Sequence, residues 1–294
     1  MILILDPHSN QALISKVMLL PTISSSTTGE EAATVLAGEI QGKNVLITGT
    51  SMGSIGFETA RVISKHANLV IIAGYSPERL KLSEDAIKEN PSASIRSLVV
   101  DLSSLGAVRK AAAEVNAYPE PLHALINNAA APIGPFKLTV DNLESQTTTD
   151  FIGPFLFTKL LTPKLLAAGT ASYVSRAVSL SSTGHSLIST LDLNTIVGKP
   201  DQATYHPFNV YSHAKAANTL LAIELSKRSD VTLTCCLDRT VVAAFDRRLN
   251  DKPGAYLSNG AEANNERAAH SLDPANGEKL WTQTEQIIGE KFTF

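Results

Sequence analysis

The run Lys43-Asn-Val-Leu-Ile-Thr48, followed by Gly49-Thr-Ser-Met-Gly53-Ser-Ile-Gly56, decides the fold of this chain. The first run is short and rich in Val, Leu and Ile, which is typical of a buried parallel strand. Residues 57–66 follow with a helical pattern. A strand, a glycine turn and a helix in this order can hold a dinucleotide pyrophosphate, because glycines let the backbone approach the phosphates and the helix N-terminus offers free N–H groups. An ordinary tight turn explains the same residues equally well, so the rest of the chain must decide.

Apolar runs that resemble buried strands recur along the chain and alternate with helical patterns. We expect strands at residues 44–48, 69–73, 97–101, 123–127, 177–181 and 231–237, and helices near 78–89, 104–116, 140–167 and 209–228. This alternation predicts an α/β fold, a single Rossmann-type, doubly wound parallel sheet with helices on both faces. Residues 41–294 show no break in composition and are expected to form one domain. Residues 1–40 are expected to form an N-terminal extension, with a polar linker at 24–29 and a helix at 30–36 that packs on the main domain.

Composition excludes several classes of protein. The 294 residues are 44% hydrophobic and carry a net charge of −3 without a basic block, so nothing indicates nucleic acid. The adjacent Cys235 and Cys236 point to opposite faces of one strand and are expected to be packing residues, which fits a reducing, cytoplasmic location. No run approaches the roughly 20 apolar residues of a transmembrane helix, and the N-terminus lacks the features of a secretory signal. Contact of the N-terminus with a membrane surface and a homo-oligomer both remain open.

The end of the second strand bears on which cofactor the chain would take. An NAD site usually has a carboxylate about 20 residues past the glycine loop, bonded to the ribose hydroxyls. Gly74 and Tyr75 occupy that place, and Arg79 and Lys81 follow close enough to meet a 2′-phosphate. The missing carboxylate favours NADP over NAD, although each charged residue could equally be a solvated opening of a helix. Asp101, at the end of the third strand, could bond the adenine amine or cap the helix that follows.

Two asparagines and three further residues complete the candidate site. Asn127-Asn128 follow the fourth strand, at the edge where open α/β sheets bind ligands, although a plain turn is the alternative. Ser182 ends the fifth strand, and Tyr211 and Lys215 share one helix face at positions i and i+4. An ammonium beside a phenol stabilises the phenolate, so this pair suits proton transfer, and Ser182 could hold the substrate oxygen. The nearby His185 and His213 are interpreted as neutral bystanders, because no spacing of residues suggests a metal site.

Taken in order, these motifs resemble the short-chain dehydrogenase/reductase family over about residues 40–290. The motifs are Thr48-Gly49, Gly53, Gly56, Asp101-Leu102, Asn127-Asn128-Ala129, Ser182 and Tyr211-x-x-x-Lys215. Within the family the chain is similar to the retinol-dehydrogenase-like branch, especially its fungal members, on Val115-Asn-Ala-Tyr-Pro119, Gly153-Pro-Phe-Leu156, Lys215-Ala-Ala-Asn218 and Lys279-Leu-Trp281. The resemblance implies a nicotinamide cofactor and hydride transfer between a carbonyl and an alcohol.

The resemblance also assigns roles to residues. Tyr211 would be the acid/base, Lys215 would assist it and hold the nicotinamide ribose, and Ser182 would orient the substrate oxygen. Asp150 joins them as a candidate catalytic residue, because it stands where the family usually has an asparagine that holds a helix bend and a proton-relay water. The expected cofactor-binding residues are Gly49, Ser51, Gly53, Ser54, Ile55, Gly56, Tyr75, Arg79, Asp101, Asn128, Tyr211, Lys215 and Val241.

The chain departs from the family pattern in four places. The glycine loop has one extra residue, which puts Ser54 in the place of the second glycine, and Ala130 replaces the glycine that usually follows the Asn-Asn-Ala motif. Asp150 replaces the family asparagine. Asp238-Arg239 stands where Pro-Gly usually follows the sixth strand, and Ala243 stands where a threonine usually bonds the carboxamide. The last two departures affect the nicotinamide end of the site.

These observations predict an NADP-dependent oxidoreductase that interconverts a carbonyl and an alcohol on a small or medium apolar substrate. Secondary metabolism is a plausible setting, by resemblance to fungal members only. The alternative is a catalytically impaired cofactor-binding or interaction protein on the same fold, which Asp238-Arg239 and Ala243 favour. The segment 185–209 and the residues after 238 are expected to shape the substrate pocket.

Overall fold

The computed structural model describes residues 23–170, 173–198, 202–229, 231–237 and 239–292. The strands are β1 (Asn44–Thr48), β2 (Leu69–Gly74), β3 (Ile95–Val99), β4 (Ala124–Asn127), β5 (Arg176–Leu180), β6 (Thr232–Cys236), β7 (Tyr256–Ser258) and β8 (Ala261–Glu262). The α-helices are α1 (Gly29–Val35), α2 (Ala37–Ile40), α3 (Ile55–Ile63), α4 (Pro77–Lys88), α5 (Leu105–Ala117), α6 (Ser145–Thr147), α7 (Gly153–Ala168), α8 (Leu193–Val197), α9 (Pro207–Arg228), α10 (Thr240–Phe245) and α11 (Pro274–Ile288). Shorter turns of helix are η1 (Thr148–Ile152, π-helical) and the 3₁₀ turns η2 (Thr183–Leu187), η3 (Arg247–Leu249), η4 (Asn264–Glu266) and η5 (Ala269–Ser271).

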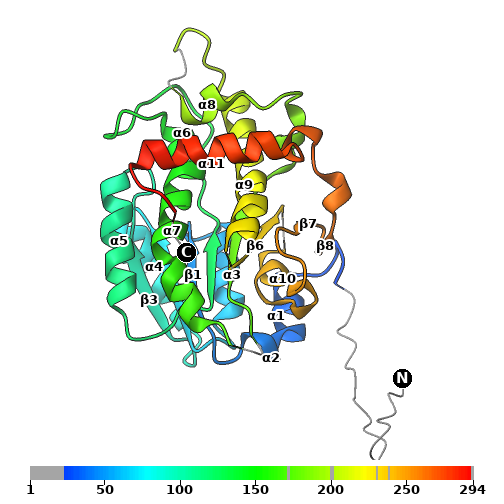
Figure 1. Ribbon diagram of the computed structural model, residues 1–294. Coiled ribbons are helices and arrows are strands. Elements are labelled where there is room, and N and C mark those ends of the chain that lie inside the picture. Colours follow the sequence, from blue (N-terminus) through cyan, green and yellow to red (C-terminus); the bar gives the residue numbers. More distant parts are fainter. Residues whose placement is uncertain (1–22, 171–172, 199–201, 230, 238, 293–294) are drawn as a thin grey trace, which may run out of the picture.

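The strands form one sheet in the order β3-β2-β1-β4-β5-β6-β7-β8, parallel except for the last pair. Alternate residues of a strand face opposite sides, so Leu46 packs in one core while Val45 and Ile47 pack in the other. The first core lies under α5, α7, α9 and α11, and the second under α1, α3, α4 and α10 (Figure 1). The predicted doubly wound α/β fold is therefore confirmed.

The structure corrects some boundaries. Strand β3 covers residues 95–99 rather than 97–101, and the helix expected from residue 140 begins at Ser145. Asn142 has a positive φ of 58°, and the hydroxyl of Thr139 accepts the N–H groups of Asp141 and Leu143, so these residues form a turn. Helices α2, α8, α10 and α11 and strands β7 and β8 were not predicted.

The extension packs closely on the sheet domain. Thr28 and Glu31 form a capping box at the start of α1, and Ala33, Leu36 and Ile40 are fully buried. The helix expected at 30–36 is thus present, as α1. Whether residues 1–40 and 41–294 are separate units stays a proposal, because residues 1–22 lie outside the described residues.

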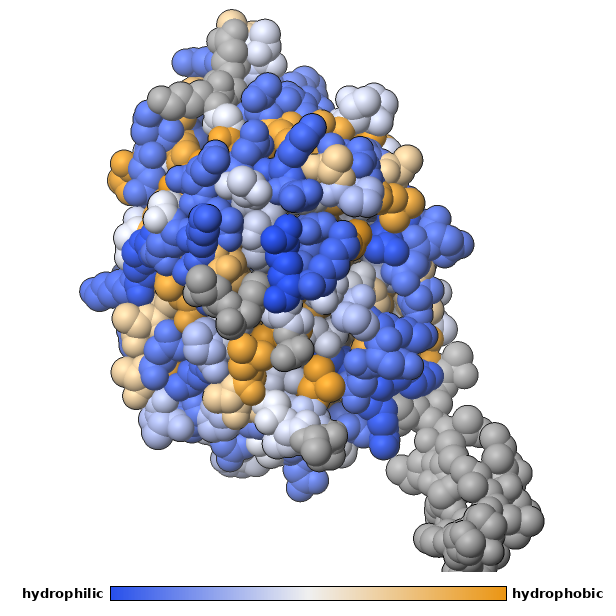
Figure 2. Space-filling view, in the orientation of Figure 1, coloured by the Kyte–Doolittle hydropathy of each residue, from blue (hydrophilic) through white to orange (hydrophobic). Residues whose placement is uncertain are grey.

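One stretch, Ser145–Ala168, has the length and composition of a membrane span, but 67% of its most apolar window is buried inside the protein, as in a core helix. On the face shown in Figure 2, apolar residues form small patches among hydrophilic ones.

Candidate functional site

The candidate site follows from the strand order. β1 lies between β2 and β4: the chain builds the sheet from β1 toward one edge as far as β3, and then from β4 toward the other edge. Dinucleotides bind across such a switch point, at the carboxyl ends of the strands. At this edge the N–H of Gly49 bonds the carbonyl of Ala73 at 2.8 Å, which places the glycine loop beside the end of β2. On the other side, the N–H of Ser181 bonds the carbonyl of Cys236 at 2.9 Å, which joins the ends of β5 and β6.

Two glycines of the loop are required by close packing. A Cβ on Gly49 would lie 2.6 Å from the Cα of Ala129, and a Cβ on Gly56 would lie 2.4 Å from the amide nitrogen of Asn128. Gly53 has a φ of 77° and open space around its Cβ position, so backbone there is accessible to a ligand. Ile55 begins α3 and is 63% exposed, and the first N–H groups of a helix have no partner inside it. These features form a cradle suited to a pyrophosphate.

Ser54 is the N-cap of α3. Its hydroxyl oxygen accepts the N–H of Phe57 at 3.1 Å and its proton is donated to the carbonyl of Gly49 at 3.0 Å. Ser54 therefore satisfies one of the free N–H groups at the start of α3, and serine in place of the family's glycine is compatible with the loop. Ser51 accepts the N–H of Ser54 through its carbonyl.

Asn128 supports the loop from below. Its side-chain amide donates to the carbonyls of Thr48 at 2.8 Å and Gly49 at 3.0 Å, and its own N–H bonds the hydroxyl of Thr48. The amide nitrogen of Asn128 is thus used to hold the glycine loop in place, and direct contact of Asn128 with a cofactor stays a prediction. Asn127 instead points into the fold and donates to Thr158 at 2.9 Å.

The candidate selectivity residues follow the end of β2. Tyr75 is 65% exposed, and Arg79 is exposed in the first turn of α4, which Ser76 caps. Lys81 is paired with Asp85 one turn further along, so Arg79 is the better candidate for a phosphate. Ser76 also donates to Glu78 at 2.7 Å, and this hydrogen bond holds the pKa of Glu78 below its usual value.

Asp101 follows β3 and is exposed. One carboxylate oxygen accepts the N–H of Ser103 at 2.9 Å and its hydroxyl at 2.7 Å. The N-cap of α5 is Ser104, so Asp101 closes a turn before the helix rather than capping it. Contact with an adenine amine stays a prediction.

Ser182 and Tyr211 are neighbours across Gly184. A Cβ built on Gly184 would lie 3.2 Å from the Tyr211 ring and 3.4 Å from the Ser182 hydroxyl oxygen, so both groups border the same point. The Ser182 oxygen accepts the N–H of Gly184 at 3.1 Å, which leaves its proton available to a ligand. Both side chains are partly exposed, as a reacting pair must be.

Lys215 lies buried behind Tyr211. Its ammonium nitrogen is 5.5 Å from the centre of the Tyr211 ring and 3.4 Å from a carboxylate oxygen of Asp150. The other Asp150 oxygen accepts the N–H of Ala131 at 2.6 Å. Burial raises the pKa of Asp150, and the ammonium of Lys215 opposes that rise. The structure thus brings the four predicted catalytic residues into one cluster.

Asp150 sits in the π-helical turn η1, between α6 and α7. Such a turn inserts an extra residue into a helix and is frequent at functional sites. Gly153, which begins α7, packs so tightly that a Cβ there would lie 2.1 Å from the carbonyl of Leu102. The family's helix bend is therefore present here with aspartate in place of asparagine.

The residues after β6 differ from expectation. Val241 and Ala243 are buried inside α10, and contact of Val241 with a cofactor stays a prediction. Asp238 lies outside the described residues. Arg239 has a φ of 51°, the left-handed conformation that glycine would adopt, and its guanidinium donates to the carbonyl of Ser25. The arginine side chain is held by the N-terminal segment.

His185, interpreted from the sequence as a neutral bystander, contacts the backbone of Ser182. Its Nδ1 lies 2.6 Å from the carbonyl of Ser182, so this nitrogen must carry the proton and donate it. The bond fixes the backbone of the serine that would orient the substrate. Its spacing of three residues, one 3₁₀ turn, is the signal that could have revealed it.

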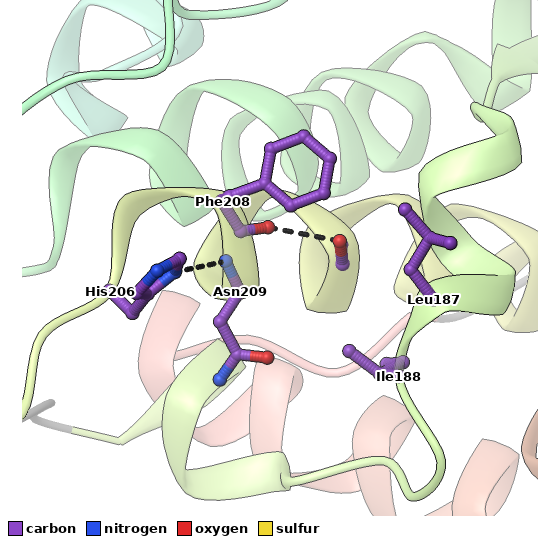
Figure 3. A pocket seen from close by; sticks show the side chains of 6 residues that line it. Leu187, Ile188, His206, Phe208 and Asn209 are labelled. Atoms are coloured by element: carbon purple, nitrogen blue, oxygen red, sulfur yellow. Dashed lines mark hydrogen bonds between the residues drawn. The ribbon is translucent and has the colours of Figure 1, made fainter.

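A pocket of about 340 Å³ lies between the segment after Ser182 and the start of α9. Figure 3 shows Leu187 and Ile188 on one side of it, and His206 and Asn209 on the other; Phe208 and Ser212 complete the lining. The ring centre of Phe208 is 6.1 Å from that of Tyr211. The predicted segment 185–209 therefore does line a pocket beside the candidate catalytic tyrosine.

Comparisons with known proteins agree with this geometry. The sequence pattern of short chain dehydrogenases matches residues 43–186. The chain belongs to the short-chain dehydrogenase/reductase family. A short-chain dehydrogenase/reductase of Armillaria gallica is 34% identical over 191 residues, 65% of this chain and 61% of the relative. Polyprenol dehydrogenase of Mus musculus is 34% identical over 190 residues, 64% of this chain and 55% of the relative. This member of the family thus spans about three fifths of the length of the curated relatives it matches.

Solved structures share the fold. An uncharacterised protein from Mycobacterium paratuberculosis superposes with a TM-score of 0.71 at 24% identity, over 88% of this chain and 98% of that one. An NADH-dependent reductase complexed with NAD gives 0.59 at 16% identity, over 76% and 97% of the two chains. A 3-oxoacyl (acyl-carrier-protein) reductase from Agrobacterium tumefaciens with NADP bound gives 0.51 at 21%, over 75% and 78%. The fungal resemblance is supported, and the retinol-dehydrogenase-like branch stays a prediction.

Proposed function

We propose that this chain is an NADP-dependent oxidoreductase that interconverts a carbonyl and an alcohol on a small or medium apolar substrate. One observation carries the proposal: the buried ammonium of Lys215 lies behind Tyr211, whose exposed side borders the hydroxyl of Ser182. A phenol, a hydroxyl donor and a buried cation in this arrangement suit proton transfer to a carbonyl oxygen.

Each residue has a distinct role in this scheme. The Ser182 proton, which its bond from Gly184 leaves unused, holds the substrate oxygen. Tyr211 donates the phenolic proton to that oxygen in reduction and takes it back in oxidation. Lys215 stabilises the resulting phenolate by its charge. A bound nicotinamide supplies or accepts the hydride.

The glycine loop fits such a cofactor, because Gly53 leaves open space beside its backbone and α3 directs free N–H groups toward the same place. NADP is preferred over NAD because no carboxylate follows β2 directly, and Arg79 is exposed where a 2′-phosphate would lie. The NAD- and NADP-bound neighbours support a nicotinamide cofactor of either kind.

The pocket beside Tyr211 supports an apolar substrate. Leu187 is 67% exposed and Phe208 is 44% exposed, so two large apolar side chains stand ready to cover a ligand. We propose that the part of the substrate remote from the reacting carbon lies there. A long-chain alcohol belongs in the test panel because one relative is named a polyprenol dehydrogenase. Secondary metabolism and a cytoplasmic location stay predictions.

The alternative, a catalytically impaired cofactor-binding or interaction protein, has two observations in its favour. Asp150 places a carboxylate against Lys215, which opposes formation of a phenolate, and Ala243 offers no hydroxyl to a carboxamide. This alternative predicts cofactor binding without turnover.

Fluorescence titration with NADPH and NADH, followed by a panel of carbonyl and alcohol substrates, separates the two functions. Once a substrate is found, we expect Tyr211→Phe to lower kcat by roughly 10²–10⁴-fold while cofactor affinity is kept. Tyr118→Phe is the matched control, because the Tyr118 hydroxyl bonds Glu114 at 2.6 Å at the far end of α5 and should leave kcat nearly unchanged. Near-parental turnover of Tyr211→Phe would exclude Tyr211 as the proton donor.

A further inference from the structure

The N-terminal segment is attached to two helices, α3 and α10, that begin at the candidate cofactor edge. Glu30 pairs with Arg61 at 3.0 Å and with Lys65 at 2.6 Å, which ties α1 to α3. Further back, Arg239 at the start of α10 donates to the backbone carbonyl of Ser25. Figure 1 shows this blue segment beside α10 and β8.

Arg239 is enclosed as well as bonded. A Cβ built on Gly260, in the turn between β7 and β8, would lie 3.3 Å from the Arg239 side chain and 3.0 Å from that of Ile23. The two side chains therefore meet over the same glycine. This packing, together with the bond to Ser25, holds Arg239 in a left-handed conformation that an arginine rarely adopts. A backbone kept in such a conformation by its surroundings is a feature of ligand sites.

The position of α10 relates the contact between Arg239 and Ser25 to the candidate cofactor site. β6, which precedes α10, lies on the same side of the switch point as β4 and β5, whereas the glycine loop and β2 lie on the other side. A dinucleotide whose pyrophosphate lies on the glycine loop reaches across the switch point with its second half. The bond between Ser181 and Cys236 brings the residues before α10 beside Ser182, so the start of α10 borders the half of the site where hydride transfer would occur.

We propose that Arg239 is a positioning residue for the nicotinamide half of the cofactor. By binding the carbonyl of Ser25 it fixes the start of α10 against the N-terminal segment, a contact that replaces the rigidity of the family's Pro-Gly. The inference rests on the proposed function, because it requires a nicotinamide cofactor.

The test compares two ligands by calorimetry. NADPH contains both halves of the cofactor, whereas 2′-phospho-ADP-ribose lacks the nicotinamide. Arg239→Gly should weaken NADPH about tenfold, the effect of losing one charge-assisted hydrogen bond, and change the affinity of 2′-phospho-ADP-ribose by less than about twofold. Arg239→Lys, which keeps the charge and part of the reach, should recover part of the loss.

Glu30→Gln is the matched control, because it loosens the same segment from α3 and leaves Arg239 in place. It should change both affinities by less than about twofold. Thermal unfolding separates positioning from stability, since glycine relieves the strain at this φ and Arg239→Gly should not lower the melting temperature.

Equal losses for the two ligands, or tighter NADPH binding by Arg239→Gly, would overturn this inference alone. Failure of the parent protein to bind either nicotinamide cofactor would overturn the proposed function and this inference with it.

Discussion

Replacing Asp150 by asparagine removes a buried carboxylate that lies 3.4 Å from the ammonium of Lys215. Asparagine has nearly the same shape, and its oxygen can still accept the N–H of Ala131. The change therefore tests charge while it keeps the π-helical turn. Because a negative charge near Tyr211 opposes the phenolate, its removal should make the phenolate easier to form.

The structure gives the size of the effect. The ammonium lies 5.5 Å from the centre of the Tyr211 ring, so the Asp150 oxygen is no further than about 9 Å from that centre. At an effective dielectric constant of about 20, two like charges at this distance repel by about 2 kcal/mol. This energy corresponds to slightly more than one pH unit. The rising limb of the rate of alcohol oxidation should therefore move about one unit toward lower pH in Asp150→Asn.

The assay is the pH dependence of kcat/KM for oxidation, measured for the parent protein and the variant. Glu144→Gln is an unsuitable control because Glu144 caps the same helix, so Asp141→Asn, on the preceding exposed turn, is used instead. An unmoved limb would refute the charge argument and would mean that Asp150 is already protonated, which its burial favours. A limb that moves to higher pH would show that Asp150 assists Tyr211.

Three further predictions concern cofactor choice and stability. Arg79→Ala should weaken NADPH about tenfold and NADH by less than about twofold, with Lys81→Ala as control; equal effects on the two cofactors would contradict a 2′-phosphate role. The pKa of His123 is lowered by burial and by nearby Lys43 to about 4, and its Nδ1 accepts the N–H of Asn44, so the folded state resists a proton that the unfolded chain binds near 6.5. The unfolding free energy should be full above pH 6.5 and fall by about 2 kcal/mol between pH 6.5 and 4, a loss that His123→Gln should largely remove in urea titrations at each pH. Arg176→Met, at a fully buried guanidinium that donates to carbonyls at the end of α10, should cost about 3 kcal/mol in the same assay, and a loss below about 1 kcal/mol would be too small for those bonds.

The sheet could be predicted because its information is local. Each strand of a parallel sheet is buried on both faces, so a run such as Leu69–Ala73 must be apolar throughout, and the glycine loop marks the first crossover. The turn before Ser145 was not predicted, because the apolar residues on either side continue a helical pattern. Asn142 interrupts that pattern by its backbone conformation, and the Thr139 hydroxyl closes the turn. Helix α10 is too short to show a period.

The catalytic residues were predictable for a similar reason. Tyr211 and Lys215 share a helix face, a relation that spacing alone reveals, and Ser182 follows a strand whose carboxyl end must lie at the same edge. The residues that hold the candidate site in place were harder to predict from the sequence. Spacing could have revealed His185, which lies one turn from Ser182, but no spacing links Arg239 to Ser25.

This difference decides how the departures from the family pattern are to be judged. From the sequence, Asp150 and Arg239 both depart from the family pattern at the nicotinamide end of the site, and Arg239 favours a catalytically impaired protein. In the fold each has a partner far away in the chain: Asp150 contacts Lys215, and Arg239 holds Ser25, 214 residues before it. In a site that had merely lost its function, a substitution that buries a charge would leave that charge unpaired, which lowers the stability of the fold by several kcal/mol. Asp150 is instead paired with a cation, and the strained backbone of Arg239 is held by packing and a hydrogen bond. The two residues therefore fit a remodelled site better than a decayed one, and turnover by the parent protein with NADPH is the observation on which that argument depends.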